Sequence, residues 1–240
     1  GNAGAGIGVN SLDIVGFGVL TPQKNVFLGN TIYSNKPGSL LGLPLPGLGI
    51  ELVKANLDGS FTPQSLTSAG PTPNDAGDSD TGPNNNTNFP VLHQASQVGT
   101  TLNLTYDLDA ADSPSNTYRI EFFANDTADP SGYGEGQTFL GAITSINGIG
   151  RSAALTLPSG LNLSGKSISA TTTAIDSTVT SGFGSTSEFS PVLTASYTAA
   201  GLADTGENIW TFVVGASALI LLAGGITLTH SRFLTKGFLD

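Results

Sequence analysis

Hydrophobic and polar residues alternate through much of the second half of this chain. The clearest run is residues 100–109, in which Leu102, Leu104, Tyr106 and Leu108 are separated by polar residues. This period of two is typical of a β-strand with one buried face. Further runs of strand type follow at regular spacing: residues 117–124, 137–144, 151–157, 166–174 and 188–193. About seven strands at this spacing predict an antiparallel β-sandwich over residues 91–198.

The same periodicity assigns two faces to the run at residues 117–124. Ile120 and Phe122 should point to one side, and Arg119, Glu121 and Phe123 to the other. We expect Arg119 and Glu121, which share a face, to form a cross-strand ion pair rather than part of a catalytic site.

Residues 1–60 show a different pattern, a short internal repeat. The segment GAGIGV at residues 4–9 recurs as GLGIEL at residues 47–52, with a further run rich in Gly and Asn at residues 25–35. Short β runs separated by Gly and Asn are typical of stacked coils, because these residues tolerate the left-handed backbone of tight corners. Residues 36–46 interrupt the spacing and are expected to form an inserted loop. A β-hairpin or an irregular β domain is the alternative.

Two resemblances extend this interpretation. The positions Gly29-Asn30, Ile32, Asn35, Gly49-Ile50 and Leu52 resemble the repeats of right-handed parallel β-helices in bacterial surface proteins. The segments TYRIEFFAN, SGYGEGQTFLG and STSEFSP resemble an immunoglobulin-like module that often follows such repeats. The first resemblance implies that residues 1–60 are the end of a β-helix. Because a solenoid needs about three repeats to bury its core, further coils are expected upstream.

The third pattern is a long apolar run at residues 209–229, which contains no Asp, Glu, Lys, Arg or Pro. A membrane-spanning helix needs about 20 such residues. Trp210 lies at one edge, where aromatic rings favour the lipid headgroup level, and Arg232 and Lys236 follow the run. The positive-inside tendency therefore predicts a cytoplasmic C-terminus, with the β-rich body outside the cell. No amphipathic helical period precedes residue 208, so that body is expected to be all-β.

A short motif precedes the apolar run: Leu202-Ala203-Asp204-Thr205-Gly206. It resembles the LPXTG motif of proteins that sortases attach to the bacterial cell wall, with Ala203 in place of proline. The resemblance implies that a sortase cysteine attacks the carbonyl of Thr205 and cleaves the Thr205–Gly206 bond. An amine of a peptidoglycan precursor would then accept the acyl group. The alternative is a chance match before an ordinary single-pass anchor.

Charge and composition narrow the classes of function. The tail contains Arg232, Lys236 and Asp240, so 6 of the 8 basic and 17 of the 18 acidic residues lie in the remainder, a net charge of −11. This argues against nucleic acid as a partner, since binding requires Lys and Arg to neutralise phosphates. The absence of cysteine excludes disulfides and thiolate ligands. The sequence contains no methionine and no signal peptide, so we expect it to be the C-terminal part of a longer exported precursor.

An acidic connector at residues 61–90 offers candidate metal ligands. Asp75, Asp78, Asp80 and Asn84 place oxygen atoms at close spacing around glycines that permit sharp turns. Ca²⁺ prefers six to eight oxygen ligands of these types. The connector is therefore either a calcium loop or a solvated, turn-rich linker. A second polar cluster is interpreted mainly as a polar loop: Asn125, Asp126, Asp129 and Glu135.

Catalytic chemistry has little support in the sequence. His93 is the only histidine before the apolar run, and no nucleophile or metal-ligand partner can be assigned to it. We therefore predict no catalytic residues and no enzyme. Exposed aromatic residues on the sandwich would favour glycan binding, and the candidates are Tyr118, Tyr133 and Phe183.

The sequence thus predicts an all-β protein with one C-terminal transmembrane helix, held at a bacterial cell surface in a structural or adhesin-type role. Its expected partners are a sortase, a peptidoglycan precursor and the membrane. The alternatives are the anchoring end of a carbohydrate-active enzyme with upstream catalytic coils, and a module that binds a glycan or a protein. The expected parts are terminal β-helix coils 1–60, connector 61–90, sandwich 91–198, spacer 199–208, membrane helix 209–229 and tail 230–240.

Overall fold

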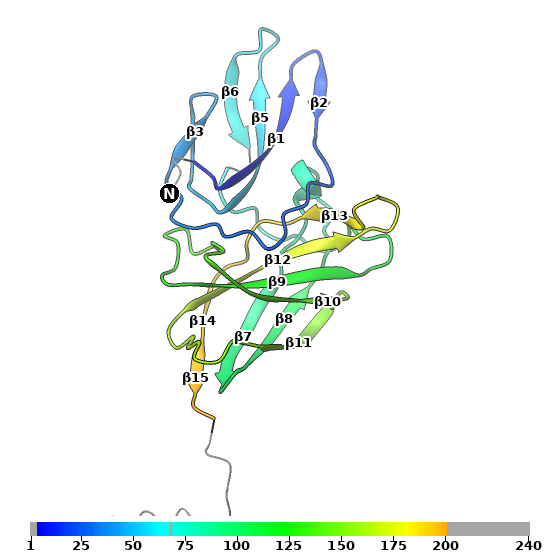
Figure 1. The fold of residues 1–240 in the computed structure, drawn as a ribbon. Helices are drawn as coiled ribbons and strands as arrows, with labels where there is room; N and C mark the ends of the chain where they lie inside the picture. Colours follow the sequence, from blue (N-terminus) through cyan, green and yellow to red (C-terminus); the bar gives the residue numbers. More distant parts are fainter. Residues whose placement is uncertain (1–3, 68, 201–240) are drawn as a thin grey trace, which may run out of the picture. The chain divides into compact units, whose positions relative to one another are not determined.

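A computed structural model describes residues 4–67 and 69–200, and these residues form an all-β fold (Figure 1). Those up to Ala199 belong to one compact unit. Nowhere in these ranges does the chain form a helix with the length and hydrophobicity that crossing a membrane requires. The predicted sorting motif Leu202–Gly206, the apolar run at 209–229 and the tail all lie outside the described residues.

The N-terminal sheet has four strands in the order β2-β1-β5-β6 (Figure 1). Their bounds are β1 Ile7–Ile14, β2 Gly18–Leu20, β5 Ile50–Leu57 and β6 Pro63–Thr67. β1 and β5 pair in parallel, with Ile7 opposite Ile50 and Val9 opposite Leu52. This is the register of the internal repeat, so the repeated segments are neighbours in space as predicted.

The surroundings of this parallel pair differ from a stack of coils. β2 pairs with β1 and β6 pairs with β5, both antiparallel, because the chain turns back at once after each long strand. Gly16 and Phe61, both with positive φ, lie in these two turns. The predicted insertion at residues 36–46 contains a small hairpin of its own, formed by β3 (Gly38–Leu40) and β4 (Leu43–Leu45).

The Gly- and Asn-rich run at residues 25–35 does not form a strand between β1 and β5. It lies against the sandwich instead, where the backbone N–H and C=O of Ile32 both bond to Gly136 at 2.8 Å. Ile32 is buried. The sequence predicts a place for Ile32 in a stack of coils, whereas the structure packs it in one cluster with residues of both the N-terminal sheet and the sandwich.

The sandwich consists of two mainly antiparallel sheets. One has the order β10-β9-β12-β13, with β14 also paired to β12, and the other has the order β11-β8-β7-β15. β15 pairs with β7 in parallel. The bounds are β7 Val91–Val98, β8 Thr101–Leu108, β9 Tyr118–Asn125, β10 Thr138–Ser145, β11 Gly148–Thr156, β12 Ser167–Ile175, β13 Phe183–Thr186, β14 Leu193–Thr194 and β15 Ser196–Thr198.

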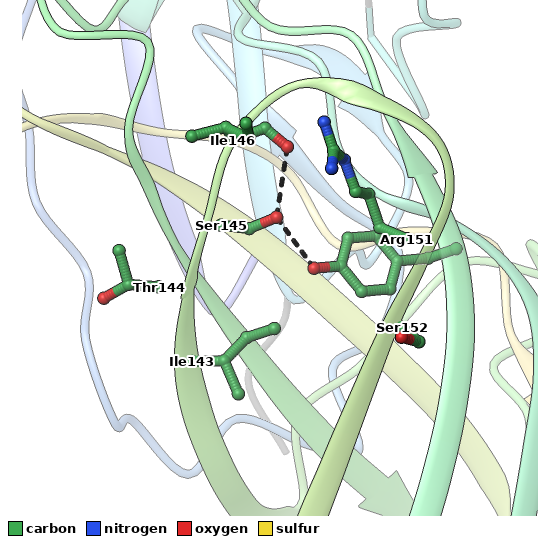
Figure 2. A pocket seen from close by; sticks show the side chains of 7 residues that line it. Ile143, Thr144, Ser145, Ile146, Arg151 and Ser152 are labelled. Atoms are coloured by element: carbon green, nitrogen blue, oxygen red, sulfur yellow. Dashed lines mark hydrogen bonds between the residues drawn. The ribbon is translucent and has the colours of Figure 1, made fainter.

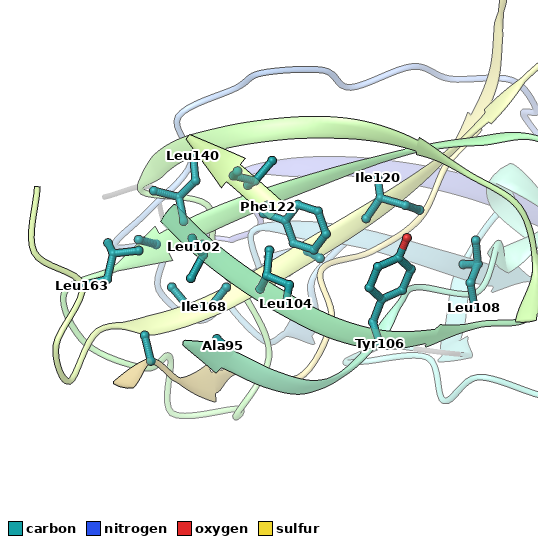
Figure 3. Packing of buried hydrophobic residues seen from close by; sticks show 14 of the residues in the cluster. Ala95, Leu102, Leu104, Tyr106, Leu108, Ile120, Phe122, Leu140, Leu163 and Ile168 are labelled. Carbon is teal, nitrogen blue, oxygen red and sulfur yellow. The ribbon is translucent and has the colours of Figure 1, made fainter. Parts of the chain in front are cut away.

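Inward side chains of the two sheets form a common core (Figure 3). Leu102, Leu104 and Tyr106 of β8 face Ile120 and Phe122 of β9, as the alternation predicts. The rings of Tyr106 and Phe122 meet edge to face with centroids 6.0 Å apart. Complete burial of side chains of this size stabilises a fold by about 1.5–3 kcal/mol each. This core is the main source of stability for the sandwich.

Five of the six predicted runs agree with strands of the structure. β8 to β12 begin and end within a few residues of the predicted runs. The run at residues 188–193 is largely not a strand, since it lies between β13 and β14. β7, β13 and β15 were not predicted.

A second core joins the N-terminal sheet to the sandwich. It contains Val9, Ile50 and Leu52 from the N-terminal sheet with Phe123 and Phe189 from the sandwich. The two phenylalanine rings are 5.3 Å apart and nearly perpendicular.

The Phe189 ring lies in a slot that three glycines leave open. A Cβ atom at Gly49, Gly134 or Gly136 would come within 2.5–2.7 Å of Phe189. The close approach of the N-terminal sheet and the sandwich therefore requires the absence of side chains at these positions.

Candidate metal centre and buried carboxylates

Three aspartates of the connector come together, as the sequence predicts. One carboxylate oxygen each from Asp75, Asp78 and Asp80 lies within 4.8 Å of the others. The buried amide of Asn88 holds the loop that carries them. Its Nδ2 donates to the backbone oxygens of Asp75 (2.8 Å) and Asp109 (2.6 Å), and its Oδ1 accepts from the N–H of Asp75 (3.2 Å).

Asp75 and Asp78 each accept several hydrogen bonds. Asp75 accepts from the hydroxyl of Ser79 at 2.5 Å and from its N–H, which lowers the pKa of Asp75. Asp78 accepts from the N–H of Asn88 (2.9 Å) and of Ala111 (2.6 Å). Burial nevertheless raises the pKa of Asp78 to about 6.

Asp80 is less well satisfied. Its Oδ2 accepts from Nδ2 of Asn86 at 3.3 Å, and its Oδ1 is buried with no hydrogen-bond donor. Asn86, in the short 3₁₀ turn η1 (Pro83–Asn86), is 9% exposed, and its Oδ1 is likewise buried without a donor. Burial is the first cause of a raised pKa at Asp80. Nothing in the sequence distinguishes Asn86 from the neighbouring asparagines.

The predicted fourth ligand, Asn84, has another role. Its Oδ1 accepts from the N–H and Nδ2 of Asn25, both at 2.9 Å. Its Nδ2 donates to the backbone oxygens of Asn25 (2.8 Å) and Thr186 (2.9 Å). Asn84 is fully buried and joins three segments that are far apart in sequence. The connector is therefore packed into the fold and is not a solvated linker at this point.

Buried glutamates of the sandwich accept hydrogen bonds from the N-terminal segment. Glu121 is fully buried, and its Oε2 accepts from the N–H of Gly29 at 2.7 Å. Its Oε1 accepts from Arg119 at 2.8 Å. The predicted ion pair between Arg119 and Glu121 is thus present, but it is not cross-strand, because both partners are on β9 two residues apart.

Glu135 makes a similar contact. Its oxygens accept from the N–H of Ser34 (2.5 Å), and from the N–H (3.0 Å) and Nδ2 (2.6 Å) of Asn35. Asn125 donates from Nδ2 to the backbone oxygen of Glu135 at 2.8 Å. Glu135 and Asn125 are buried, so the expected polar loop is in part an internal contact. Asp126 of the same cluster is exposed and pairs with Lys166 at 2.7 Å.

Glu188 and Glu51 form a buried acidic pair near the second core. Glu188 accepts from the N–H of Leu52 and of Thr72, both at 2.8 Å. Burial raises the pKa of Glu188 to about 8, and the charge of Glu51 adds to this effect. Glu51 accepts from the N–H of Gly70 at 2.5 Å, its Oε2 has no donor, and burial raises its pKa to about 7. Sequence analysis missed both residues.

The remaining candidates do not assemble into a site. His93 is half-exposed, and its Nε2 lies 2.9 Å from Oδ2 of Asp107 on the neighbouring strand. Tyr118 was a candidate for an exposed aromatic residue, but the structure buries it in the core. Its hydroxyl donates to the backbone oxygen of Ala110. Tyr133 packs edge to face on Phe89 and is partly buried.

One hollow of about 300 Å³ lies beside the β10–β11 turn (Figure 2). The hydroxyl of Tyr106 donates to Ser145 at 2.8 Å, and Ser145 donates to the backbone oxygen of Ile146 at 3.1 Å. Arg151 donates from Nη2 to the backbone oxygen of Asn147. Its Nε is buried with no acceptor, and among the described residues no carboxylate forms an ion pair with it.

Comparison with known proteins adds no relative to these observations. Neither a scan against protein-family models nor a search of curated proteins gives a match. The function therefore has to be argued from the residues and the geometry.

Proposed function

We propose that this chain is the C-terminal part of a bacterial cell-surface protein and acts as a spacer. In this proposal a rigid β body presents an upstream region away from the envelope, and a sortase attaches the chain to the wall. The proposal assigns the chain no catalytic residues of its own. Its support comes from the contacts within the body and from the order of motifs at the C-terminal end.

The observation that carries the spacer role is the way the N-terminal segment is held. Glu121, Glu135 and Glu188 all belong to the sandwich unit, and all accept backbone N–H groups from residues 29–72. Hydrogen bonds to charged groups are worth about 1.5–3 kcal/mol each, and bonds between neutral groups about 0.5–1.5 kcal/mol. Because burial raises the pKa of Glu188 to about 8, its two bonds belong to the neutral class near pH 7. Together with the shared core around Phe189, these bonds oppose bending between the two sheet systems.

The fold of the proposed spacer is the end of a right-handed parallel β-helix followed by an immunoglobulin-like sandwich. The parallel pairing of β1 with β5 over eight residues supports the first part, because coils of a solenoid stack in this way. The two packed, mainly antiparallel sheets support the second part.

The proposed anchor rests on sequence alone. Thr205–Gly206 is the bond that a sortase would cleave, and the apolar run with Trp210, Arg232 and Lys236 would hold the chain in the membrane until cleavage. The net charge of −11 outside the tail is compatible with solubility at a cell exterior and with bound cations.

Mass spectrometry of wall digests from cells that produce the protein tests the proposal. We expect a C-terminal peptide that ends at Thr205 and carries a peptidoglycan fragment. A Thr205→Ala variant should lose this product, whereas the control Thr211→Ala, just beyond the motif, should keep it. An intact terminus at Asp240 in wall-free membranes would contradict sortase attachment.

The hollow beside Arg151 favours a second candidate, the binding of an acidic glycan. The Arg151 guanidinium lines the hollow together with Tyr106 and Ser145, and no carboxylate among the described residues pairs with it, which suits the carboxylate of a uronic acid. We expect oligogalacturonate to bind the wild-type protein and to bind an Arg151→Gln variant at least tenfold more weakly. Equal binding by both proteins, or none by either, would remove this candidate.

A further inference from the structure

We propose that Asp75, Asp78, Asp80 and Asn86 form a Ca²⁺ site. The site would join the connector loop to the η1 turn. The proposal does not depend on the anchor or on the spacer role, since every ligand lies within the described fold.

The charge of the cluster is not balanced by the protein. Three carboxylates have oxygens within 4.8 Å of one another. The five ion pairs among the described residues involve other carboxylates, so no Lys, Arg or His neutralises these three. Like charges at this distance repel strongly when they are partly buried. A bound divalent cation would convert the repulsion into attraction.

Two buried oxygens without hydrogen-bond donors are an independent argument for a bound cation. Oδ1 of Asp80 and Oδ1 of Asn86 are both buried and accept no hydrogen bond. The side chains are adjacent, since Nδ2 of Asn86 lies 3.3 Å from Oδ2 of Asp80 and 3.5 Å from the backbone oxygen of Thr81. Both distances exceed the usual range for N–H···O bonds. A buried acceptor without a partner is costly. A cation would satisfy Oδ1 of Asp80 directly, and it would satisfy Oδ1 of Asn86 once the amide, whose Nδ2 now faces Asp80, has turned over.

The ligand chemistry selects Ca²⁺. All four side chains offer oxygen, and the chain contains no cysteine that could bind a soft metal. Ca²⁺ accepts six to eight oxygens at about 2.3–2.6 Å in flexible geometry, and water can complete the shell. Mg²⁺ demands a near-ideal octahedron at about 2.0–2.1 Å. An irregular loop with one carboxylate fixed by Asn88 and Ala111 fits the less demanding ion.

The position of the site gives it a structural role. Asn86 ends the η1 turn, and Asn84 in the same turn binds Asn25 and Thr186. A cation held by Asn86 and the aspartates would fix this turn. It would thereby stabilise the contact between the N-terminal segment and the sandwich.

Calorimetric titration of the full-length chain in mild detergent, after treatment with EDTA, tests the proposal. We expect one Ca²⁺ per chain with a Kd of about 10⁻⁴–10⁻³ M, as in extracellular modules, and weaker binding of Mg²⁺. At about 100 times Kd, Ca²⁺ should raise the Tm by roughly 5 °C.

Variants separate this site from other acidic groups. Asp80→Asn and Asn86→Gly should each weaken Ca²⁺ binding at least tenfold, and glycine is compatible with the φ of 51° at Asn86. The control Asp126→Asn, an exposed aspartate paired with Lys166, should bind as the wild type does. The proposal is overturned if the wild type shows neither binding heat nor a shift in Tm. It is also overturned if folded Asn86→Gly binds Ca²⁺ with unchanged affinity.

Discussion

At the scale of single residues, the main feature of this protein is the number of buried polar side chains that bond to backbone groups. The sequence predicted the cluster of Asp75, Asp78 and Asp80, because closely spaced aspartates indicate a metal loop. It did not predict the burial of Glu51 and Glu188, because an isolated glutamate ordinarily indicates an exposed position. Only the arrival of a distant N–H group makes such burial tolerable, and local sequence holds no information about that group.

The raised pKa values of Glu51 and Glu188 predict how stability depends on pH. Both carboxyls keep a proton in the folded protein at pH values where the unfolded chain, with pKa near 4.5, has lost it. The contribution of these two groups to the free energy of unfolding should therefore be largest below about pH 4.5. It should fall by about 1.4 kcal/mol per pH unit for each such group, up to about pH 7 for Glu51 and pH 8 for Glu188.

Urea denaturation at a series of pH values measures this slope. A Glu188→Gln variant should lose the part of the slope between pH 5 and 8 that belongs to Glu188. The exposed-site variant Asp126→Asn should retain it. If Glu188→Gln shows the slope of the wild type, Glu188 is ionised in the folded protein throughout this range.

Asn84 is a second residue-scale test. An Asn84→Ala variant would remove four hydrogen bonds and leave buried groups of Asn25 and Thr186 unpaired. We expect a loss of about 2–4 kcal/mol in the free energy of unfolding, measured by urea denaturation. The neighbouring Asn85, which is partly exposed and bonds to Asp112, provides the control, and Asn85→Ala should cost about 1 kcal/mol. Equal effects of the two variants would show that Asn84 has no special role.

At the scale of secondary-structure elements, alternation predicted β8 to β12 well because each has one face in the core. β7 was missed because buried Gln97 replaces an apolar residue in its pattern. The Gln97 amide donates to Gly99 and Leu161 and accepts from Leu163. The run at residues 188–193 was predicted as a strand because its composition suits one. It instead turns Glu188 and Phe189 toward the N-terminal sheet.

The glycine slot around Phe189 gives a prediction at this scale. A Gly49→Ala variant would place a Cβ 2.7 Å from the Phe189 ring, so one of the two sheet systems must shift. We expect a loss of about 1–3 kcal/mol in stability, measured by thermal or urea unfolding. Gly8→Ala is the matched control, because the nearest atom to its Cβ would be 3.7 Å away on an exposed side chain. A destabilisation by Gly8→Ala as large as that by Gly49→Ala would contradict the packing described.

At the scale of the whole molecule, the repeat of residues 4–9 at 47–52 predicted stacked β runs, and β1 and β5 do pair in parallel, in the register of that repeat. The sequence could not predict that residues 25–35 lie on the sandwich, because Gly and Asn suit a coil corner and an extended surface segment equally well. Residues 61–90 were interpreted as either a calcium loop or a solvated linker, whereas their buried asparagines bond to Asn25 of the N-terminal segment and to Asp109 and Thr186 of the sandwich region. The central claim is therefore that the described residues up to Ala199 act as one unit.

Native-state hydrogen exchange tests this claim most directly. The N–H groups of Gly29 and Leu52, which donate to Glu121 and Glu188, should exchange with the same opening free energy as buried amides of β9 and β12. This result would mean that the N-terminal segment opens only when the sandwich unfolds. The contradicting result is that Gly29 and Leu52 exchange with an opening free energy several kcal/mol smaller while β9 and β12 stay protected. The N-terminal sheet and the sandwich would then be independent, and the rigid spacer would be contradicted.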